Sequence, residues 1–360
     1  MYHFRFITLN DLKEIDYTGN FPSNQFNWIY NWFSVFEKVE NNVLGYNKKA
    51  CIVAAYKDDQ LVAVVPLVKL YRTYFKVIKI EFLEFMGQQW SCLGNDIIKF
   101  DDLEECFSSE LISWIKTNIK FHFIFFKYLP ESSVLANKYR LFHYAGAPFV
   151  QVGKYNNYKV FSDEVYAGKF RMDLRRTFRK IKKDGFEFEL SFEKINEASL
   201  SEIRRIAKSK EVDGKSFLYG DTEKAQFHLK MYECFPSQVV FVKFNQQVVA
   251  YATSIDWNGE RIGIDAAFDR DYRKYGAGIH CIDAVIQHSF SEKKQKLSFG
   301  MGLDTYKFQF TDQIDRYYMC FDYQLRLKSL FALPYFLYRL KKEEQQVIKN
   351  LQNVNGNGGI

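Results

Sequence analysis

The stretch RIGIDAAF at residues 261–268 leads into the turn RKYGAG at residues 273–278, and an apolar helical pattern follows from Ile279 to about Phe290. This order predicts a strand, a glycine turn and a helix. Two glycines two residues apart let the backbone approach a ligand closely, and the start of the helix offers unpaired N–H groups and the positive end of the helix dipole. The sequence therefore predicts a phosphate site at this turn. A tight strand-to-helix connection is the alternative interpretation.

The spacing within this turn narrows the prediction. Residues 273–278 read R-x-x-G-x-G, which resembles the R/Q-x-x-G-x-G/A signature of the GNAT acyltransferases, whose backbone amides hold the pyrophosphate of acetyl-CoA. A P-loop would end in G-K-[ST] and a dinucleotide-binding turn would read G-x-G-x-x-G, and neither fits. The resemblance implies acetyl-CoA or another acyl-CoA as the co-substrate. The residues expected to bind it are Phe268, Arg273, Lys274, Gly276, Ala277 and Gly278.

A second motif extends the resemblance. After a short predicted strand at residues 296–299, residues 302–310 read GLDTYKFQF. This is similar to the G-x-x-x-Y-K-x-x-F/W ending of a bacterial GNAT subfamily that is associated with cellulose or exopolysaccharide biosynthesis and is related to the Fem peptidoglycan transferases. The resemblance implies an α/β fold of two tandem GNAT-like domains, with mixed, mostly antiparallel sheets flanked by helices.

The order of the predicted elements occurs twice along the chain. Residues 51–68 predict a hairpin, and a strand at 78–85, a helix near 103–116 and a strand at 121–126 follow. Residues 239–299 repeat this order, with the hairpin turn displaced by 187 residues. A chain of 360 residues, of which 47% are apolar, is also too long for one typical core. Two globular domains are therefore expected.

We accordingly divide the chain at residues 1–150, 151–325, 326–351 and 352–360. The first segment is predicted to be a degenerate GNAT-like domain. The turn after its third strand, at residues 87–96, has its glycines seven apart and no arginine three residues before either. Because this turn cannot cradle a pyrophosphate in the same way, we assign acyl-CoA to the second domain. The first domain is expected to contribute to the acceptor cleft.

The end of the chain carries no strong functional signal. Residues 326–351 predict an amphipathic helix interrupted at Pro334, which either docks on the fold or lies on a membrane surface. Residues 352–360 are polar and glycine-rich and are expected to be disordered. No stretch approaches the ~18 apolar residues that span a membrane, and the N-terminus lacks a signal-peptide pattern. We expect a cytoplasmic protein, with contact at the inner face of the membrane as a further expectation.

The net charge of +7 is concentrated in one predicted helix. Residues 169–183 hold eight Lys or Arg residues and one Asp, a net charge of seven. Such confinement favours a local anionic partner over a nucleic acid. Residues 175–179 read RRTFR and resemble an R-R-x-x-R/K stretch of the same family, which makes Arg175 and Arg176 candidates for acceptor binding. Lys215 is a third candidate, since the family often carries a glycine-containing acceptor loop there. A solvated amphipathic face is the alternative for the helix.

Acyl transfer from a thioester needs a phosphate anchor, a group that polarises the carbonyl, a base and an acid. Resemblance to GNAT enzymes places a tyrosine near the sulfur after the last core strand, which makes Tyr306 the candidate acid. Asp265 is the candidate base, because it lies within an apolar strand where we expect burial to raise its pKa. Lys307 is predicted to hold an anionic acceptor or the cofactor. A core tyrosine and a structural aspartate are the alternatives.

These features predict an acyl-CoA-dependent N- or O-acyltransferase whose acceptor is an amino-sugar or polysaccharide precursor. The acceptor is expected to be a small molecule or a lipid- or nucleotide-linked sugar. An aminoacyl-tRNA-dependent Fem-type peptidoglycan transferase is the alternative, although the long helical hairpin of those enzymes has no counterpart in the sequence. A non-catalytic binding protein on a GNAT scaffold is the third. The six cysteines show no zinc spacing, so no metal is expected. No nucleic-acid partner is expected either, and the oligomeric state stays open.

Overall fold

The computed structural model describes residues 1–74, 77–89, 93–209 and 218–357. The chain divides into two compact units. The first is made of Met1–Gly146 and Arg316–Gly356, and the second contains Ala147–Asp315. The first division falls close to the predicted boundary at residue 150. The second falls at residue 315, whereas the predicted second domain ended at 325.

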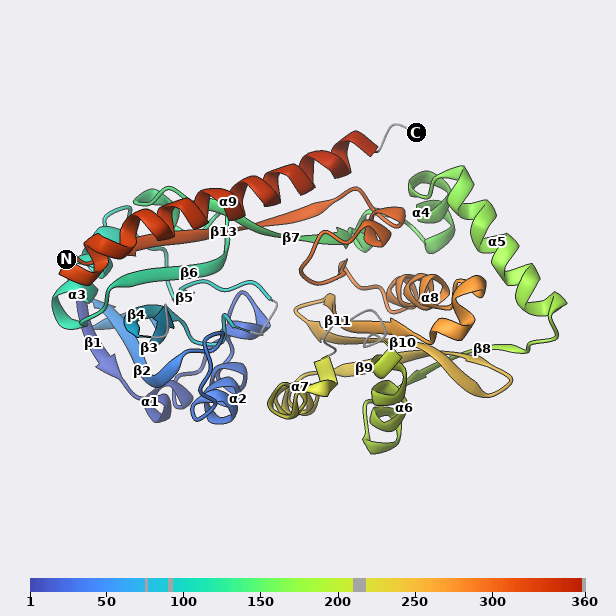
Figure 1. Cartoon of the computed structure of the whole chain (residues 1–360), viewed down its shortest axis with the longest axis horizontal. Coiled ribbons are helices and arrows are strands. Elements are labelled where there is room, and N and C mark those ends of the chain that lie inside the picture. The colour runs from blue at the N-terminus through green and yellow to red at the C-terminus, as the bar shows by residue number, and fades with distance from the viewer. Residues whose placement is uncertain (75–76, 90–92, 210–217, 358–360) are drawn as a thin grey trace. The chain divides into compact units, whose positions relative to one another are not determined.

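In the first unit the strands lie in the order β1-β2-β3-β4-β6-β13, and β5 pairs with β3 (Figure 1). The β4–β6 pair is parallel and the other neighbours are antiparallel. The elements are β1 (His3–Ile7), α1 (Leu9–Lys13), a 3-10 turn (Pro22–Asn24), α2 (Phe26–Phe36), β2 (Tyr46–Lys57), β3 (Gln60–Tyr74), β4 (Ile78–Phe85), β5 (Ile98–Lys99), α3 (Phe107–Asn118), β6 (Phe123–Pro130), a 3-10 turn (Val134–Asn137), β13 (Ile314–Tyr323) and α9 (Leu327–Asn357).

Two helices cover opposite faces of this sheet. Leu111 and Ile115 of α3 are buried in one core cluster with alternate residues of the strands, such as Leu83 of β4. On the other face, Phe336 of α9 packs against Phe123, with 4.5 Å between the two ring centroids. Alternate side chains of a strand point to opposite faces, so one sheet supports both layers.

Helix α9 departs from the prediction in two ways. It runs without a break through Pro334, where an interruption was predicted, and it reaches Asn357, so residues 352–357 of the predicted disordered tail are helical. A proline inside a helix removes one hydrogen bond and costs about 3 kcal/mol. Phe336 and Leu340, both buried just beyond it, offset that cost by packing on the sheet.

In the second unit the strands lie in the order β7-β12-β11-β10-β9-β8. Only the β11–β12 pair is parallel among the pairs described here. The elements are β7 (Phe142–Val150), a 3-10 turn (Val152–Lys154), α4 (Tyr158–Val165), α5 (Gly168–Lys183), β8 (Phe188–Glu193), α6 (Glu197–Ala207), a 3-10 turn (Leu218–Gly220), α7 (Thr222–Cys234), β9 (Ser237–Phe244), β10 (Gln247–Trp257), β11 (Glu260–Phe268), the 3-10 helix η6 (Arg270–Tyr275), α8 (Ala277–Ser291), β12 (Lys296–Ser298) and the 3-10 helix η7 (Thr305–Gln309).

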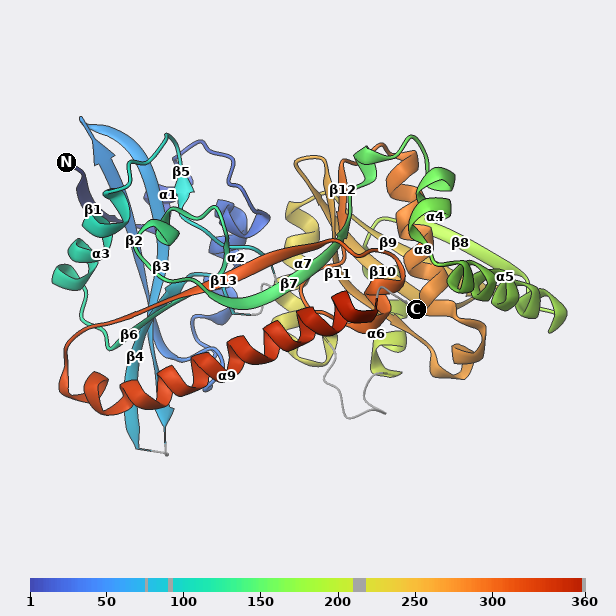
Figure 2. The ribbon, with the colours of Figure 1, turned by 90° about the horizontal axis from the view of Figure 1, so that it is seen from above.

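The sheet of the second unit is also covered on both faces. Figure 1 shows α8 along one face of β9, β10 and β11, and α6 and α7 along the other. Seen from above in Figure 2, α5 lies beside α8 on the same side. The fold class predicted from the sequence is confirmed: an α/β fold with mixed, mostly antiparallel sheets flanked by helices, in which the strand-strand-strand-helix-strand order recurs. Among the described residues, no helix combines the length and apolar character that crossing a bilayer requires.

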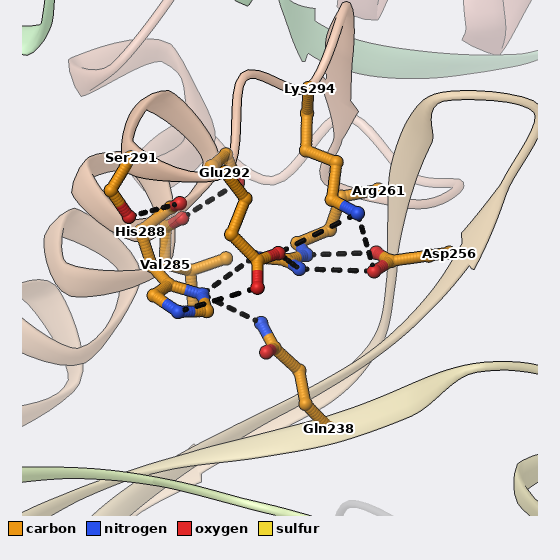
Figure 3. Close-up of polar contacts among 9 residues, drawn as sticks. Gln238, Asp256, Arg261, Val285, His288, Ser291, Glu292 and Lys294 are labelled. Carbon is orange, nitrogen blue, oxygen red and sulfur yellow. Dashed lines mark hydrogen bonds and ion pairs between the residues drawn. The ribbon is translucent and has the colours of Figure 1, made fainter.

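A buried ion-pair cluster fixes α8 to the strand before the glycine turn (Figure 3). The Arg261 guanidinium, at the start of β11, is fully buried. Its Nε donates to Asp256 Oδ1 at 2.9 Å, and it also pairs with Glu292 at the end of α8. The Lys294 ammonium completes the cluster, 2.8 Å from Asp256 Oδ2. The cluster therefore holds the distal end of α8 in register with β11.

We expect Arg261→Met to destabilise the fold by about 2–3 kcal/mol. Removing one partner of a buried ion pair costs more than that when the carboxylates stay buried. Here Asp256 and Glu292 are partly exposed and keep Lys294 as a partner, which lowers the cost. The free energy of unfolding in urea measures the effect. A variant as stable as the wild type would show that the cluster does not hold α8.

Candidate functional site

Strands β11 and β12 separate at the point where the candidate site begins. Their pairing covers only Glu260–Ile262 and Lys296–Ser298. Beyond it, Gly300 has φ +70 and lies so close to the Gly263 carbonyl that a Cβ on it would come within 2.7 Å of that oxygen. Only glycine fits there, so the chain turns away from β11.

A cavity of about 820 Å³ lies between the second half of β11 and the segment that turns away. Its walls come from the end of β11, the glycine turn, the first turn of α8 and the start of η7. The lining residues that the sequence predicted are Phe268, Arg273, Gly276, Ala277, Gly278 and Tyr306. The fold thus brings two separate sequence motifs to one cavity.

Each glycine of the turn has its own structural reason. Gly276 has φ +66, a left-handed conformation that side chains disfavour, and it ends η6 and begins α8. Gly278 has no such strain, but a Cβ on it would lie 2.8 Å from the ring of Phe268. Phe268 therefore closes the turn from the β11 side. The two glycines of the R-x-x-G-x-G motif therefore have different causes: the backbone conformation requires Gly276, and packing against Phe268 requires Gly278.

The N-terminus of α8 is open toward the cavity. The first N–H groups of a helix have no partner within it, and among the described residues no side chain caps this end. Ala277, Gly278 and Ile279 all line the cavity, so these N–H groups face it together with the positive end of the dipole of a 15-residue helix. Arg273 is exposed at the rim. This arrangement suits an anion.

Helix α5, which carries the excess charge, lies against the glycine turn. Its Thr177 Oγ1 is 2.9 Å from Nε2 of His280 in α8, and Asp184, which follows α5, accepts a hydrogen bond from Tyr275 at 2.8 Å. Arg175 and Arg176 are exposed and do not line the cavity. Arg176 forms an ion pair with Asp173, with 3.0 Å between Nη2 and Oδ1. The basic helix is thus placed beside the predicted donor site, with Arg175 and Arg176 exposed to solvent.

Tyr306 faces the cavity from η7. The residue is 38% exposed, because it borders the cavity. The surrounding protein raises the pKa of its phenol through burial, and the Asp304 and Asp265 carboxylates make smaller contributions in the same direction. The phenol is therefore protonated at neutral pH, as an ordinary tyrosine is, and can donate its proton. The influence of Asp265 also shows that the two predicted catalytic residues lie within electrostatic reach of each other.

Asp265 lies just behind the cavity wall. It follows Ile264, an extra residue at a β-bulge where the pairing of β11 with β10 shifts between Thr253 and Ser254. The carboxylate accepts a hydrogen bond from Tyr251, a fully buried residue of β10 that underlies the cavity. Asp265 is partly exposed, so the expected burial within an apolar strand is incomplete.

The position of Lys307 differs from the prediction that it holds an anionic acceptor or the cofactor. Its side chain is almost fully buried, and Nζ donates to the carbonyls of Gly300, Met301 and Gly302 at 3.0–3.2 Å. It does not line the cavity. An ammonium held by three carbonyls is not available to an anionic ligand, so Lys307 acts on the site by fixing the turn that precedes Tyr306.

Two further predicted residues are placed as follows. Lys274 is exposed and lies over the ring of Tyr275, with 5.0 Å from Nζ to the ring centroid, and it does not line the cavity. Its assignment to cofactor binding therefore has no support from the cavity walls. Lys215 lies outside the described residues.

The cavity also has walls that the sequence did not indicate. They include Ser209, Tyr251, Ala266, Arg270, Asp304 and Thr305. Ser209 Oγ donates to the Phe268 carbonyl at 2.9 Å and so joins the end of α6 to the end of β11. Nothing in the motif spacing marks these residues, because they reach the cavity only through the tertiary fold. In the described part of the chain, no three His, Cys, Asp or Glu side chains gather as metal ligands do.

Residues 168–308 match the family model described as the acetyltransferase (GNAT) domain. The matched segment runs from the start of α5 into η7 and contains the whole cavity. The second unit thus carries a GNAT-type acyltransferase domain. No curated protein sequence matches the chain.

Solved structures share the fold across both units. FemX has a TM-score of 0.54 at 10% identity, over 88% of this chain and 96% of that chain. A conserved protein of unknown function from Bacteroides thetaiotaomicron also has a TM-score of 0.54, at 13% identity, over 89% of this chain and all of its own. At these identities the likeness shows the fold alone. The link to cellulose or exopolysaccharide biosynthesis stays a prediction.

Proposed function

We propose that the second unit transfers an acyl group from acyl-CoA to an amine or hydroxyl of an amino-sugar or polysaccharide precursor. One observation carries the proposal: a single cavity has an uncapped helix N-terminus at its rim and Tyr306 in its wall. A thioester donor with a pyrophosphate needs both features, an anion cradle and a proton donor for the thiolate.

The residues around the glycine turn fit the phosphate end of such a donor. Gly276 and Gly278 present backbone without side chains, and Arg273 adds a cation at the rim. Phe268 and Ile279 supply apolar wall for an uncharged chain that leads inward. A volume of about 820 Å³ lies within the range of cofactor sites, which is ≈ 300–1,000 Å³.

Two residues would handle the protons of the transfer. The acceptor nitrogen or oxygen forms a bond to the thioester carbonyl carbon, and the carbon–sulfur bond breaks. Asp265 receives the proton that the acceptor loses, and the Tyr306 phenol gives its proton to the departing thiolate. Tyr251 is a positioning residue, because its hydroxyl fixes the Asp265 carboxylate. Lys307 is a second positioning residue, because its ammonium fixes the turn that precedes Tyr306.

The acceptor assignment rests on charge. Helix α5 has the chain's main cationic surface, so we propose that Arg175 and Arg176 bind the phosphate or carboxylate of a nucleotide- or lipid-linked sugar. A lipid-linked acceptor would place the protein in the cytoplasm at the inner face of the membrane, and this localisation belongs to the same proposal.

We expect Arg175→Gln combined with Arg176→Gln to raise the acceptor KM and to weaken its dependence on salt. Both changes follow from the loss of two exposed cations that attract an anion. Lys182→Gln with Lys183→Gln is the matched control, because it removes the same charge from the end of the same helix. If the double arginine variant changes the CoA Kd instead, α5 serves the donor. If it changes neither quantity, α5 is a solvated face.

A second donor class is favoured by the position of α5. Seven net positive charges beside the glycine turn are more than a single pyrophosphate requires. They would suit a donor with an extended anionic body, such as aminoacyl-tRNA. Transfer to one set of acceptors from acetyl-CoA and from aminoacyl-tRNA, followed side by side, separates the two donors. A GNAT scaffold that binds CoA without transfer would give product from neither.

A further inference from the structure

A second cavity, of about 550 Å³, lies in the first unit on the sheet face that α9 covers. It is far from the motifs that define the donor site in sequence, and none of its lining residues was predicted to function. Aromatic side chains from β3, β4, β6 and α9 supply much of its wall. These are Tyr74, Phe82, Phe125, Tyr335 and Phe336.

Two of the cations around this cavity are neutralised by carboxylates. Arg72 pairs with Glu84 through a contact of 2.6 Å, and its remaining N–H groups donate to the carbonyls of Asn42 and Val43. Arg339 forms an ion pair with Glu343, four residues further along α9, with 2.7 Å between Nη2 and Oε1. Each of these two pairs has no net charge, so any preference of the cavity for an anion depends on the remaining charged side chain of its lining.

That side chain is Lys127 of β6. Among the described residues, no carboxylate oxygen lies within 4.0 Å of its Nζ. Its Nζ lies over the ring of Tyr144, 5.0 Å from the ring centroid. Burial lowers the pKa of Lys127, and the neighbouring Arg72 contributes in the same direction, although Glu84 opposes both. The cavity thus contains a partly buried cation that, among the described residues, has no carboxylate within ion-pair distance.

The backbone beside Lys127 is strained. Tyr128 has φ +63, which is unfavourable for an aromatic residue, and it is the extra residue where the pairing of β6 with β13 shifts. Such bulges change the direction in which the neighbouring side chains point. Strain of this kind persists only where the surrounding structure holds it, and it concentrates at functional sites.

We infer that this cavity is a binding site for an organic anion. A carboxylate or phosphate group pairs with the Lys127 ammonium, and a flat or apolar body packs against Tyr74 and Phe336. The aromatic walls favour such a body, and a partly desolvated ammonium gains most from an ionised partner. The inference does not depend on the donor proposed for the second unit.

The test uses three probes in calorimetric titrations of the full chain. They are 1-naphthyl phosphate, which has the anion and the flat body, 1-naphthol, which has only the body, and inorganic phosphate, which has only the anion. We expect 1-naphthyl phosphate to bind more tightly than either of the others. Lys127→Met should weaken its binding about 10- to 100-fold, the range for a lost hydrogen bond to a charged group.

Matched variants separate this effect from general charge loss. Lys79→Met removes an exposed lysine of β4 that does not line the cavity, and it should bind the probe like the wild type. Lys127→Arg keeps the charge and should recover most of the affinity. CoA binding should be the same in Lys127→Met and wild type. Equal binding of 1-naphthyl phosphate and 1-naphthol, no binding of 1-naphthyl phosphate, or its unchanged binding by Lys127→Met would each overturn the inference.

Discussion

Gly276→Asp is expected to abolish CoA binding. The substitution places a carboxylate at the uncapped N-terminus of α8, where the pyrophosphate is expected to approach the backbone. A carboxylate there would occupy the same N–H groups that the phosphate needs and would repel it. A Cβ at this position meets Thr177 only at ordinary contact distance, 3.6 Å, so steric disruption of the fold is small. Isothermal titration calorimetry with CoA measures the loss.

Two controls isolate the charge from backbone strain. Gly185 has φ +80, and a Cβ on it would have no neighbour within 4 Å, so Gly185→Asp introduces the same residue into a similar left-handed conformation away from the cavity. It should bind CoA like the wild type. Gly276→Asn has nearly the same size as the aspartate without its charge and should retain part of the affinity. Wild-type affinity in Gly276→Asp would place the phosphate site elsewhere.

Tyr306→Phe is expected to lower turnover by about 10²–10⁴, the range for losing a positioned acid or base. The change removes one hydroxyl from a ring that borders the cavity, and no hydrogen bond of that hydroxyl holds the fold among the described residues. Stability and CoA affinity should therefore stay close to those of the wild type. Steady-state kinetics at saturating acetyl-CoA measure the drop in kcat.

Tyr272→Phe serves as the control for this experiment. Its hydroxyl donates to Gln247 at 3.1 Å and does not line the cavity, so turnover should be unchanged. Asp265→Asn tests the base in the same assay and should lower turnover by a similar factor. Full turnover by Tyr306→Phe would exclude the phenol from the mechanism and leave thiolate release to water or to the acceptor.

Local geometry explains why the glycine turn could be predicted from the sequence. A left-handed residue at Gly276 and a close approach at Gly278 both demand glycine, so the structure leaves a direct trace in the sequence. The repeated order of strands and helix could be predicted for a similar reason, since hydrophobic periods of two and 3.6 residues follow from burial on a sheet or helix face.

Side-chain direction could not be predicted in the same way. Lys307 follows a motif tyrosine, and a sequence pattern does not reveal that its ammonium points back to three carbonyls of its own turn. Tyr251 is 14 residues from Asp265 along the chain and reaches it only because β10 and β11 pair. The continuity of α9 through Pro334 likewise depends on Phe336 packing against strands of the first unit.

We propose that the protein transfers an acyl group from CoA in the cavity between β11 and η7. The most direct measurement incubates the protein with acetyl-CoA and a set of amino-sugar and nucleotide-sugar acceptors, and follows free thiol together with product mass. We expect thiol release that depends on the acceptor, is matched by an acetylated product and is absent from Gly276→Asp. Tight CoA binding without release from any acyl-CoA, or transfer from aminoacyl-tRNA alone, would contradict the proposal.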